Sequence, residues 1–214
     1  MPERARVLLA LPEVVRPILL EAIEGRDTCV VSTRVGLGVL AYFGISARAV
    51  PTSFVAFNSA GWEAACSGTP VEQWPEHAHS VGAAGPFGRD PITGKLNGHL
   101  VIAADDRYLV DMSADQYARP LQDIAISART LKVPPGWDWR PGQRLLYRHE
   151  GTAFVYEIAP QEPAVWRASP QWRIDADVRD VIGRAIRAMR ERLQSAPPEQ
   201  PGELQSLEIW TRAA

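Results

Sequence analysis

The sequence predicts an α+β fold in which helices pack on an antiparallel sheet. Three observations lead to this class: a nearly wholly apolar helix followed by a strand, a hairpin pattern in the middle of the chain, and a long amphipathic helix near the end. Strands therefore cluster between helices and do not alternate with them, which is the pattern of an α+β protein and not of a parallel βαβ sheet.

The composition fits one domain spanning residues 1–214. Hydrophobic residues make up 46% of the chain and charged residues 22%, both ordinary values for a globular protein. The net charge of −2 gives no basic signature, so no nucleic-acid partner is expected. Most basic residues are Arg, which indicates a GC-rich genome such as that of a bacterium or its phage. The domain is expected to have a core over about 25–160, a helix over 175–194 and a tail over 195–214.

The first predicted element is a helix over residues 4–24, with a break or kink near Pro12 or Pro17. The prolines and charges in this stretch make its apolar run too short for a signal peptide or a membrane span. The two cysteines, Cys29 and Cys66, indicate no disulfide framework. We therefore expect a cytoplasmic protein with free thiols and no membrane partner.

The second predicted helix is buried. Asp27 or Thr28 can serve as its N-cap and Gly44 stands where a C-terminal glycine belongs. Because nearly every residue between them is apolar or small, the helix should be surrounded by protein. Gly36 and Gly38 weaken a helix interior, so they predict close approach by a neighbouring backbone.

The remaining elements follow from periodicity and turn residues. Residues 47–57 predict a strand with Pro51 at an edge or bend, and residues 58–98 a long irregular segment rich in Gly and Pro. Residues 152–159 alternate as a strand does. Residues 175–193 place apolar side chains on one helical stripe. A linker and one last short strand, "LQSLEIWTR", complete the chain.

Cys29 lies in the first turn of the buried helix. The unpaired backbone N–H groups and the positive end of the helix dipole at that position favour the thiolate form. The Cys29 N–H could also donate to an oxyanion. A lone cysteine in an apolar helix is more often structural, and only its place at the helix start favours chemistry. Cys66, among small residues, is expected to be incidental.

The stretch "HLVIAADDRYLVD" predicts a hairpin that carries a polar residue at each outer end. A three-residue loop over 104–106 would place His99 directly opposite Asp111, within hydrogen-bonding range. A two-residue loop would turn Asp111 to the other face. Asp105 and Asp106 suit the left-handed backbone that a three-residue loop needs. The alternative is that the two polar residues end their strands at the solvent boundary.

Taken together, "DTCVVSTRVGLGVLAYFGISARAV", "GHLVI" and "YLVDMSADQY" resemble the transglutaminase-like branch of the papain-like cysteine enzymes, over about residues 25–120. The resemblance implies Cys29 as nucleophile, His99 as general base and acid, and Asp111 as the residue that orients His99. Val101 stands where such families often have an aromatic residue. The oxyanion Gln of papain-like enzymes is absent before Cys29, which leaves Gln116 as a candidate donor.

Other residues offer alternative chemistry. His77 and His79 form an H–x–H pair in a loop without an obvious third metal ligand, and Cys29, His99 and Asp111 could themselves bind zinc. No cofactor is expected. Trp62 and other loop tryptophans could either line a substrate groove or pack in the core.

The sequence leaves three functions open. The first is a thiol enzyme that hydrolyses, deamidates or transfers the acyl group of a protein, peptide or small amide. The second is a non-catalytic binding or regulatory protein with a vestigial triad, in which the long 58–98 segment could block the cleft. The third is a metal-dependent module.

Overall fold

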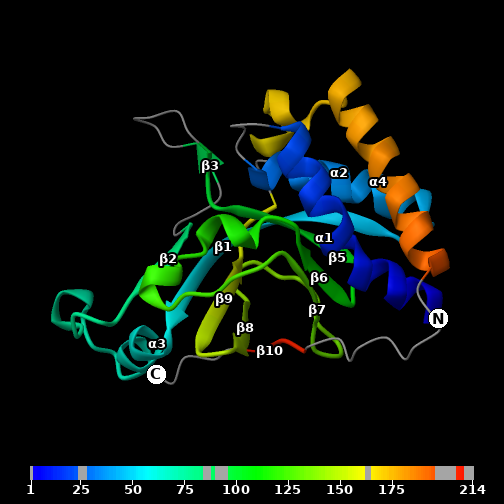
Figure 1. Ribbon diagram of the computed structural model, residues 1–214. Coiled ribbons are helices and arrows are strands. Elements are labelled where there is room, and N and C mark those ends of the chain that lie inside the picture. The colour runs from blue at the N-terminus through cyan, green and yellow to red at the C-terminus, as the bar shows by residue number, and fades with distance from the viewer. Residues whose placement is uncertain are drawn as a thin grey trace.

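The computed structural model describes residues 2–23, 28–83, 88–89, 96–161, 165–195 and 206–209. These residues form four α-helices and an eight-stranded antiparallel sheet curled into a half-barrel, which confirms the α+β class. Figure 1 shows α1, α2 and α4 gathered over one side of the sheet, with α3 at the opposite end of the long strands. No helix among these residues has the length and apolar character needed to cross a membrane.

The helices have well-defined bounds. They are α1 (Pro2–Ala22), α2 (Thr28–Tyr42), α3 (Ser59–Cys66) and α4 (Ala176–Ser195), and the short 3-10 turns are η1 (Val71–Gln73), η2 (Ala114–Tyr117), η3 (Pro120–Gln122), η4 (Val165–Ala168) and η5 (Pro170–Trp172). The buried helix and the amphipathic C-terminal helix are confirmed. Gly44 follows α2 with φ +68°, as predicted, whereas the N-cap candidate Asp27 lies outside the described residues.

The main sheet has the strand order β10–β8–β9–β1–β5–β6–β7, with β2 also paired to β1. The strands are β1 (Ala47–Asn58), β2 (Ser80–Ala83), β5 (His99–Ala104), β6 (Tyr108–Asp111), β7 (Arg129–Lys132), β8 (Arg144–His149), β9 (Thr152–Ile158) and β10 (Glu208–Ile209); β3 (Gly88–Arg89) and β4 (Leu96–Asn97) form a separate pair. Leu207 N donates to Lys132 O at 2.8 Å. This bond and the bridge between Lys132 and Ser206 link the two ends of the curled sheet.

The first strand is central, so of the two alternatives predicted for Pro51, an edge or a bend, the edge is wrong. β1 pairs with β5 over residues 47–52 and with β9 over residues 52–58. Pro51 O accepts from Ala159 N, just beyond the end of the β9 ladder. Pro51 has no backbone N–H to donate, and at this position the β9 ladder needs no donor from β1.

Residues 58–98 are more regular than the prediction of one irregular segment. They include α3, β2 and the β3–β4 pair. The side chain of Asn58 accepts from Gly61 N and caps α3. Because Asn is a favoured N-cap residue, Asn58 could have indicated a helix start at this position. The linker predicted over 195–203 lies almost entirely outside the described residues.

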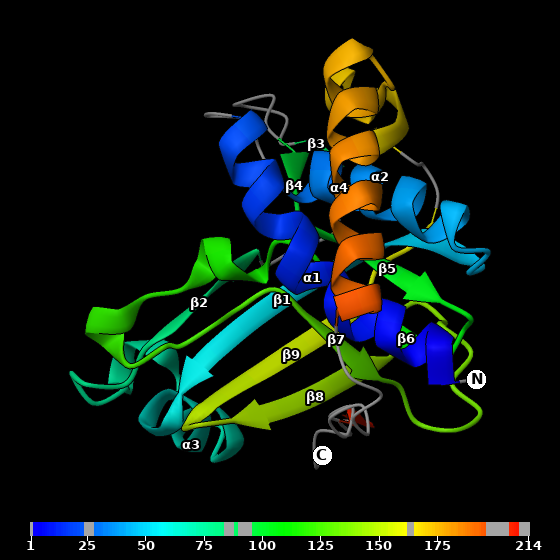
Figure 2. The same cartoon turned by 45° about the vertical axis from the view of Figure 1, so that its right-hand side comes forward.

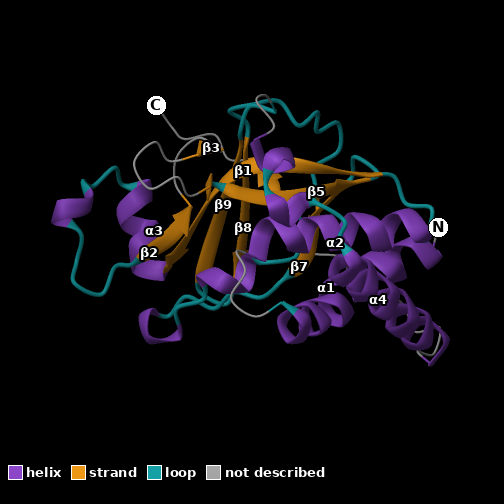
Figure 3. Cartoon of the chain, turned by 90° about the horizontal axis from the view of Figure 1, so that it is seen from above, coloured by secondary structure: helices purple, strands orange, loops and turns teal. Residues whose placement is uncertain are grey.

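Two apolar cores lie on the two faces of the sheet. Along β5, Ile102 and Ala104 face the core formed with α1, α2 and α4, while Val101 and Ala103 face the core inside the half-barrel. Figure 3 shows the helices stacked on one side of the strands. This alternation fixes the direction of each β5 side chain, including that of His99 at its start.

The helix α1 continues through Pro12 and Pro17 without a break, although its ribbon bends along its length (Figure 2). Its apolar side chains Leu8, Leu11 and Val15 are completely buried in the helical core. This burial offsets the hydrogen bonds that the prolines remove.

The glycines of α2 make room for side chains and not, as predicted, for a neighbouring backbone. A Cβ at Gly36 would lie 2.6 Å from Cδ1 of Ile102, and one at Gly38 would lie 2.6 Å from Cδ1 of Ile182. The close approach itself is confirmed. It lets α2 pack between the sheet and α4.

We predict that Gly38→Ala destabilises the protein by about 1–2 kcal/mol, because overpacking outweighs the gain in helix propensity. The new methyl would meet three atoms of Ile182, so a simple rotation would not relieve the clash. The control is Gly183→Ala on α4, where a Cβ meets only Arg187 Nη1 at 3.6 Å. Chemical denaturation should show the control unchanged or stabilised; a stabilised Gly38→Ala would contradict this packing.

Candidate functional site

The β5–β6 hairpin has a three-residue loop, but it lies one residue later than predicted. Ile102 pairs with Val110 and Ala104 with Tyr108, so the loop is residues 105–107. Asp105 and Asp106 have φ of 47° and 51°, the left-handed conformation expected of them. Since the loop still has three residues, His99 and Asp111 remain on one face, as diagonal and not directly opposed neighbours.

The two polar residues at the hairpin mouth are bonded to each other. His99 Nε2 lies 2.8 Å from Asp111 Oδ2, and neither side chain has any solvent exposure. The alternative, in which they end their strands at the solvent boundary, is therefore wrong.

Asp111 has two further donors. The backbone N–H of Ser113 donates to Oδ1 at 3.0 Å, and the hydroxyl of Tyr156 on β9 donates to Oδ2 at 3.1 Å. A buried carboxylate needs such partners, since an unpaired charge in the interior is strongly unfavourable. Tyr156 was missed in the sequence, although the alternation of residues 152–159 gives it the same face as Phe154.

The protonation states follow from these contacts. Burial lowers the pKa of His99, but the charge and hydrogen bond of Asp111, aided by Cys29, outweigh burial and raise it from 6.5 to about 10. Burial raises the pKa of Asp111, whereas His99, Ser113 and Tyr156 together hold it below its ordinary value. Burial and the nearby Asp111 raise the pKa of Tyr156 well above 10. The site therefore holds an imidazolium–carboxylate pair with a neutral phenol as donor.

Cys29 is the third residue that acts on the imidazole. It is the second residue of α2 and its side chain is nearly buried, with 5% exposure. Nδ1 of His99 has no partner of standard hydrogen-bond geometry. The Cys29 thiol is nonetheless close enough to raise the pKa of His99 through hydrogen bonding and charge. The structure thus brings Cys29, His99 and Asp111 together in that order.

Hydrogen bonds between elements fix this order. Thr33 Oγ1, one turn after Cys29, donates to Leu100 O at 3.1 Å, and Thr52 Oγ1 on β1 donates to His99 O at 3.3 Å. The first bond ties α2 to β5 and the second ties β5 to β1. Both bonds are buried, so they hold the helix start against the strand start.

Aromatic rings enclose His99. The ring of Phe54 lies 5.4 Å from the imidazole, and the ring of Tyr117 meets it edge-on at the same distance. Phe54 also packs on Tyr156 at 5.0 Å. These contacts limit rotation of the imidazole and exclude water from the ion pair.

Gln116 lies near the site, on η2 between Asp115 and Tyr117. Arg16 of α1, nearly buried, bonds Asp115 Oδ2 through both Nε and Nη2 at 2.9 Å. This pair braces η2 against α1. Gln116 therefore lies beside Tyr117, the η2 residue whose ring contacts His99.

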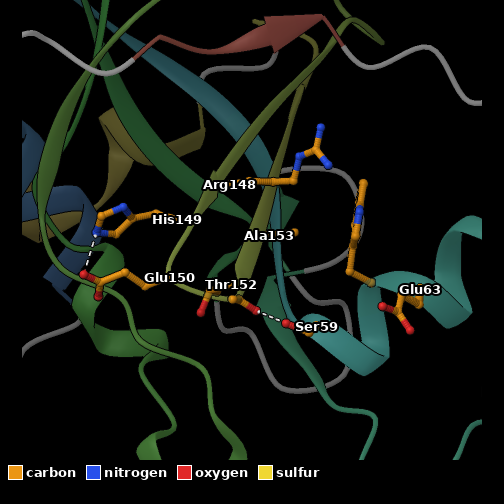
Figure 4. Close-up of a pocket in the computed structure, with 9 residues that line it drawn as sticks. Ser59, Glu63, Arg148, His149, Glu150, Thr152 and Ala153 are labelled. Carbon is orange, nitrogen blue, oxygen red and sulfur yellow. Dashed lines mark hydrogen bonds and ion pairs between the residues drawn. The ribbon is translucent and has the colours of Figure 1, made fainter.

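Trp62 is not brought to this cluster. It lies on α3 and lines an open pocket of about 330 Å³ with Glu63 and Arg148. Figure 4 shows the labelled lining residues coming from α3 and the β8–β9 hairpin. On β1, Thr52 pairs with His99, whereas Asn58, six residues further on, pairs with Thr152 of the β8–β9 hairpin. At 3.3–3.4 Å per residue, these two positions on β1 lie roughly 20 Å apart.

Metal binding finds no support in the described residues, among which no group of three His, Cys, Asp or Glu side chains could hold an ion. The backbone of His77 and His79 is bonded to Asn58, which ties this loop to the start of α3.

Comparison with known proteins identifies no relative: no family model, curated protein or solved structure matches this chain. Its function must therefore be inferred from the geometry of the site itself.

We predict that Tyr156→Phe lowers the free energy of unfolding by about 1.5–3 kcal/mol, the usual effect of losing a hydrogen bond to a charged group. The ring contact with Phe54 is kept. In a double-mutant cycle, the effect should largely disappear in an Asp111→Asn background. Equal losses in both backgrounds, measured by chemical denaturation, would show that the hydroxyl does not act on Asp111.

We further predict a pH dependence that stems from His99. Because its pKa is raised, its contribution to stability is fully present below pH 6.5 and is lost as the pH rises through about 10. Denaturation of the wild type and of His99→Gln at pH 6, 8 and 10 should give a difference that shrinks with rising pH. A difference independent of pH would mean that His99 is neutral in the folded protein.

Proposed function

We propose that the protein is a thiol-dependent enzyme that acts on an amide or related acyl group, built on a transglutaminase-like, papain-like core. The observation that carries this proposal is the ordered contact of Cys29, His99 and Asp111. A buried helix that presents a cysteine at its start, packed on an antiparallel sheet, supports it further. The proposed substrates are proteins, peptides or small amides.

The proposed reaction starts from a resting ion pair in which the proton of the Cys29 thiol already lies on Nδ1 of His99, so that a thiolate faces the imidazolium. The sulfur attacks the carbonyl carbon, and an S–C bond forms as the carbonyl oxygen takes up the electron pair. Nδ1 of His99 then returns the proton to the leaving amine, the C–N bond breaks and a thioester remains. Asp111 stabilises the imidazolium and fixes its orientation throughout.

The second half of the reaction needs an acceptor. Water attacking the thioester would give hydrolysis or deamidation, and an amine would give acyl transfer; in both cases His99 takes the proton of the acceptor and Cys29 leaves. The N–H of Cys29 lies at the helix start, where backbone donors are unpaired, and is the proposed oxyanion donor. Gln116 remains the candidate for the second donor.

The second candidate function is a non-catalytic binding or regulatory protein with the same core. One observation favours it: His99 and Asp111 have no exposed surface and Cys29 has 5%. A triad this enclosed could serve as a structural ion pair alone.

Labelling with a thiol-reactive acyl probe tests the enzyme proposal. We predict rapid stoichiometric labelling at Cys29 near pH 6, lost in Cys29→Ala and retained in Cys66→Ala, since Cys66 is an exposed residue at the end of α3. Mass spectrometry of the labelled peptide identifies the site. Labelling confined to Cys66 would contradict the proposal and favour the non-catalytic alternative.

The triad geometry makes a further prediction on rate. Asp111→Asn should slow labelling of Cys29 by at least about a hundredfold, the usual contribution of an oriented acid–base residue. Asp105→Asn, in the hairpin loop, is the matched control and should leave the rate unchanged. Equal rates in both variants would show that Asp111 does not act on the reacting thiol.

A further inference from the structure

Arg34 is the only charged residue in the sequence of α2, the helix that begins with the candidate nucleophile. It follows Val30 by four residues, and residues four apart share one face of a helix. Val30 packs in the same apolar cluster as Cys29. Along the helix axis, Arg34 lies about 7.5 Å from Cys29, at 1.5 Å per residue. A positive charge therefore stands on the face of α2 that packs beside the thiol.

The Arg34 side chain rests on an aromatic ring of this cluster. Its Cζ lies over the Trp172 ring, 5.4 Å from the ring centre, and Trp172 packs against the cluster that contains Cys29. The 3-10 turn η5, which ends with Trp172, is in contact with α2. The ring attracts the cation but does not replace a carboxylate as acceptor for its N–H donors.

Arg34 has no acidic partner. Its side chain is partly buried, and its Nε is buried without a hydrogen-bond acceptor. Across the part of the chain that the structure describes, no carboxylate pairs with it, whereas the buried Arg16 is paired with Asp115. A buried donor without an acceptor carries the cost of desolvation with no compensating bond. A ligand that brings acceptors to Arg34 would supply that bond.

The segment 165–175, which packs on this side of the thiol, adds further positive charge. It contains Arg167 and Arg173, and its only acidic residue is Asp175. Asp175 is already engaged, because its Oδ1 accepts from Val178 N at 2.9 Å and caps α4. An excess of positive charge therefore lies beside the site, although the whole chain has a net charge of −2. Such a local field attracts anions.

We propose that Arg34 binds a carboxylate of the substrate, so that the enzyme prefers acyl compounds with a negative charge near the scissile amide. This inference rests on the proposed function and names its substrate class: peptides with acidic side chains, or small amides that carry a free carboxylate. The fork of N–H donors on a guanidinium matches the two oxygens of a carboxylate.

Matched pairs of chloromethyl ketones test the proposal on the full chain in the Cys66→Ala background. Within a pair, the side chain next to the ketone carbon ends either in a carboxylate or in the neutral carboxamide; the pairs differ in having one, two or three methylene groups before it. The Cys29 sulfur displaces the chloride, and mass spectrometry follows the adduct. For at least one length, the carboxylate probe should react at least about tenfold faster, the effect of one hydrogen bond to a charged group. Equal rates within every pair, or faster reaction of the carboxamides, would overturn the proposal.

Variants of two arginines locate the preference. Arg34→Gln should bring the ratio of the two rates down to about one, and the loss should appear in the probe concentration at half-saturation, because Arg34 acts on binding. The control is Arg167→Gln, which removes the same charge from an exposed residue over the Trp166 ring. This control should change the ratio by no more than about twofold, since exposed charges interact weakly.

Two outcomes of the Arg34 series remain to be distinguished. If Arg34→Gln does not fold, Arg34→Lys serves in its place; it keeps the charge but loses the planar fork, and should lower the ratio in part. A ratio that is unchanged in the Arg34 variant, even with both rates reduced, would show that Arg34 only packs on Trp172 and would refute the carboxylate site.

His99→Gln separates this inference from the proposed function. Labelling of Cys29 that is equally fast in His99→Gln would contradict the triad, whatever the preference between the probes. Labelling that depends on His99 but shows no preference for a carboxylate would leave the enzyme proposal standing and overturn the role of Arg34 alone.

Discussion

The buried carboxylate of Asp111 is the constraint on which the rest of the site depends. A charge with no exposure is tolerable only when donors surround it, and Asp111 has three: His99 Nε2, Tyr156 hydroxyl and Ser113 N–H. These donors come from β5, from β9 and from the turn that leads to η2. Satisfying one carboxylate therefore sets the relative positions of three separate parts of the fold.

The same constraint orients the imidazole toward the thiol. Because Nε2 is engaged by Asp111, Nδ1 is the ring nitrogen left for another partner, and Cys29 at the start of α2 is close enough to raise the pKa of His99. The threonine bonds to Leu100 O and His99 O hold helix and strand at this spacing. The ion pair is enclosed by Phe54 and Tyr117, and a low local dielectric strengthens it. Such a site is preorganised for proton transfer and nearly closed to solvent, since His99 and Asp111 have no exposed surface and Cys29 has 5%.

Much of this could be predicted from local patterns. The burial of α2, its close packing at Gly36, and the loop length that keeps His99 and Asp111 on one face all follow from periodicity and turn chemistry. The predicted loop of the β5–β6 hairpin begins one residue too early, because Ala104 can either end a strand or begin a turn. Tyr156 and Arg16 could not be assigned, since each reaches the site through tertiary pairing that leaves no local signal. Trp62 failed as a site residue for the same reason: only the strand register shows its distance from His99.

The protonation state of His99 tests the account most directly, and 15N–1H NMR of the imidazole measures it, with His99→Gln to assign the signal. The account predicts an imidazolium at pH 8, with a strongly deshielded Nε2–H bonded to Asp111 and a titration well above pH 6.5. A neutral ring at pH 8, titrating near pH 6.5 as an exposed histidine does, would contradict it.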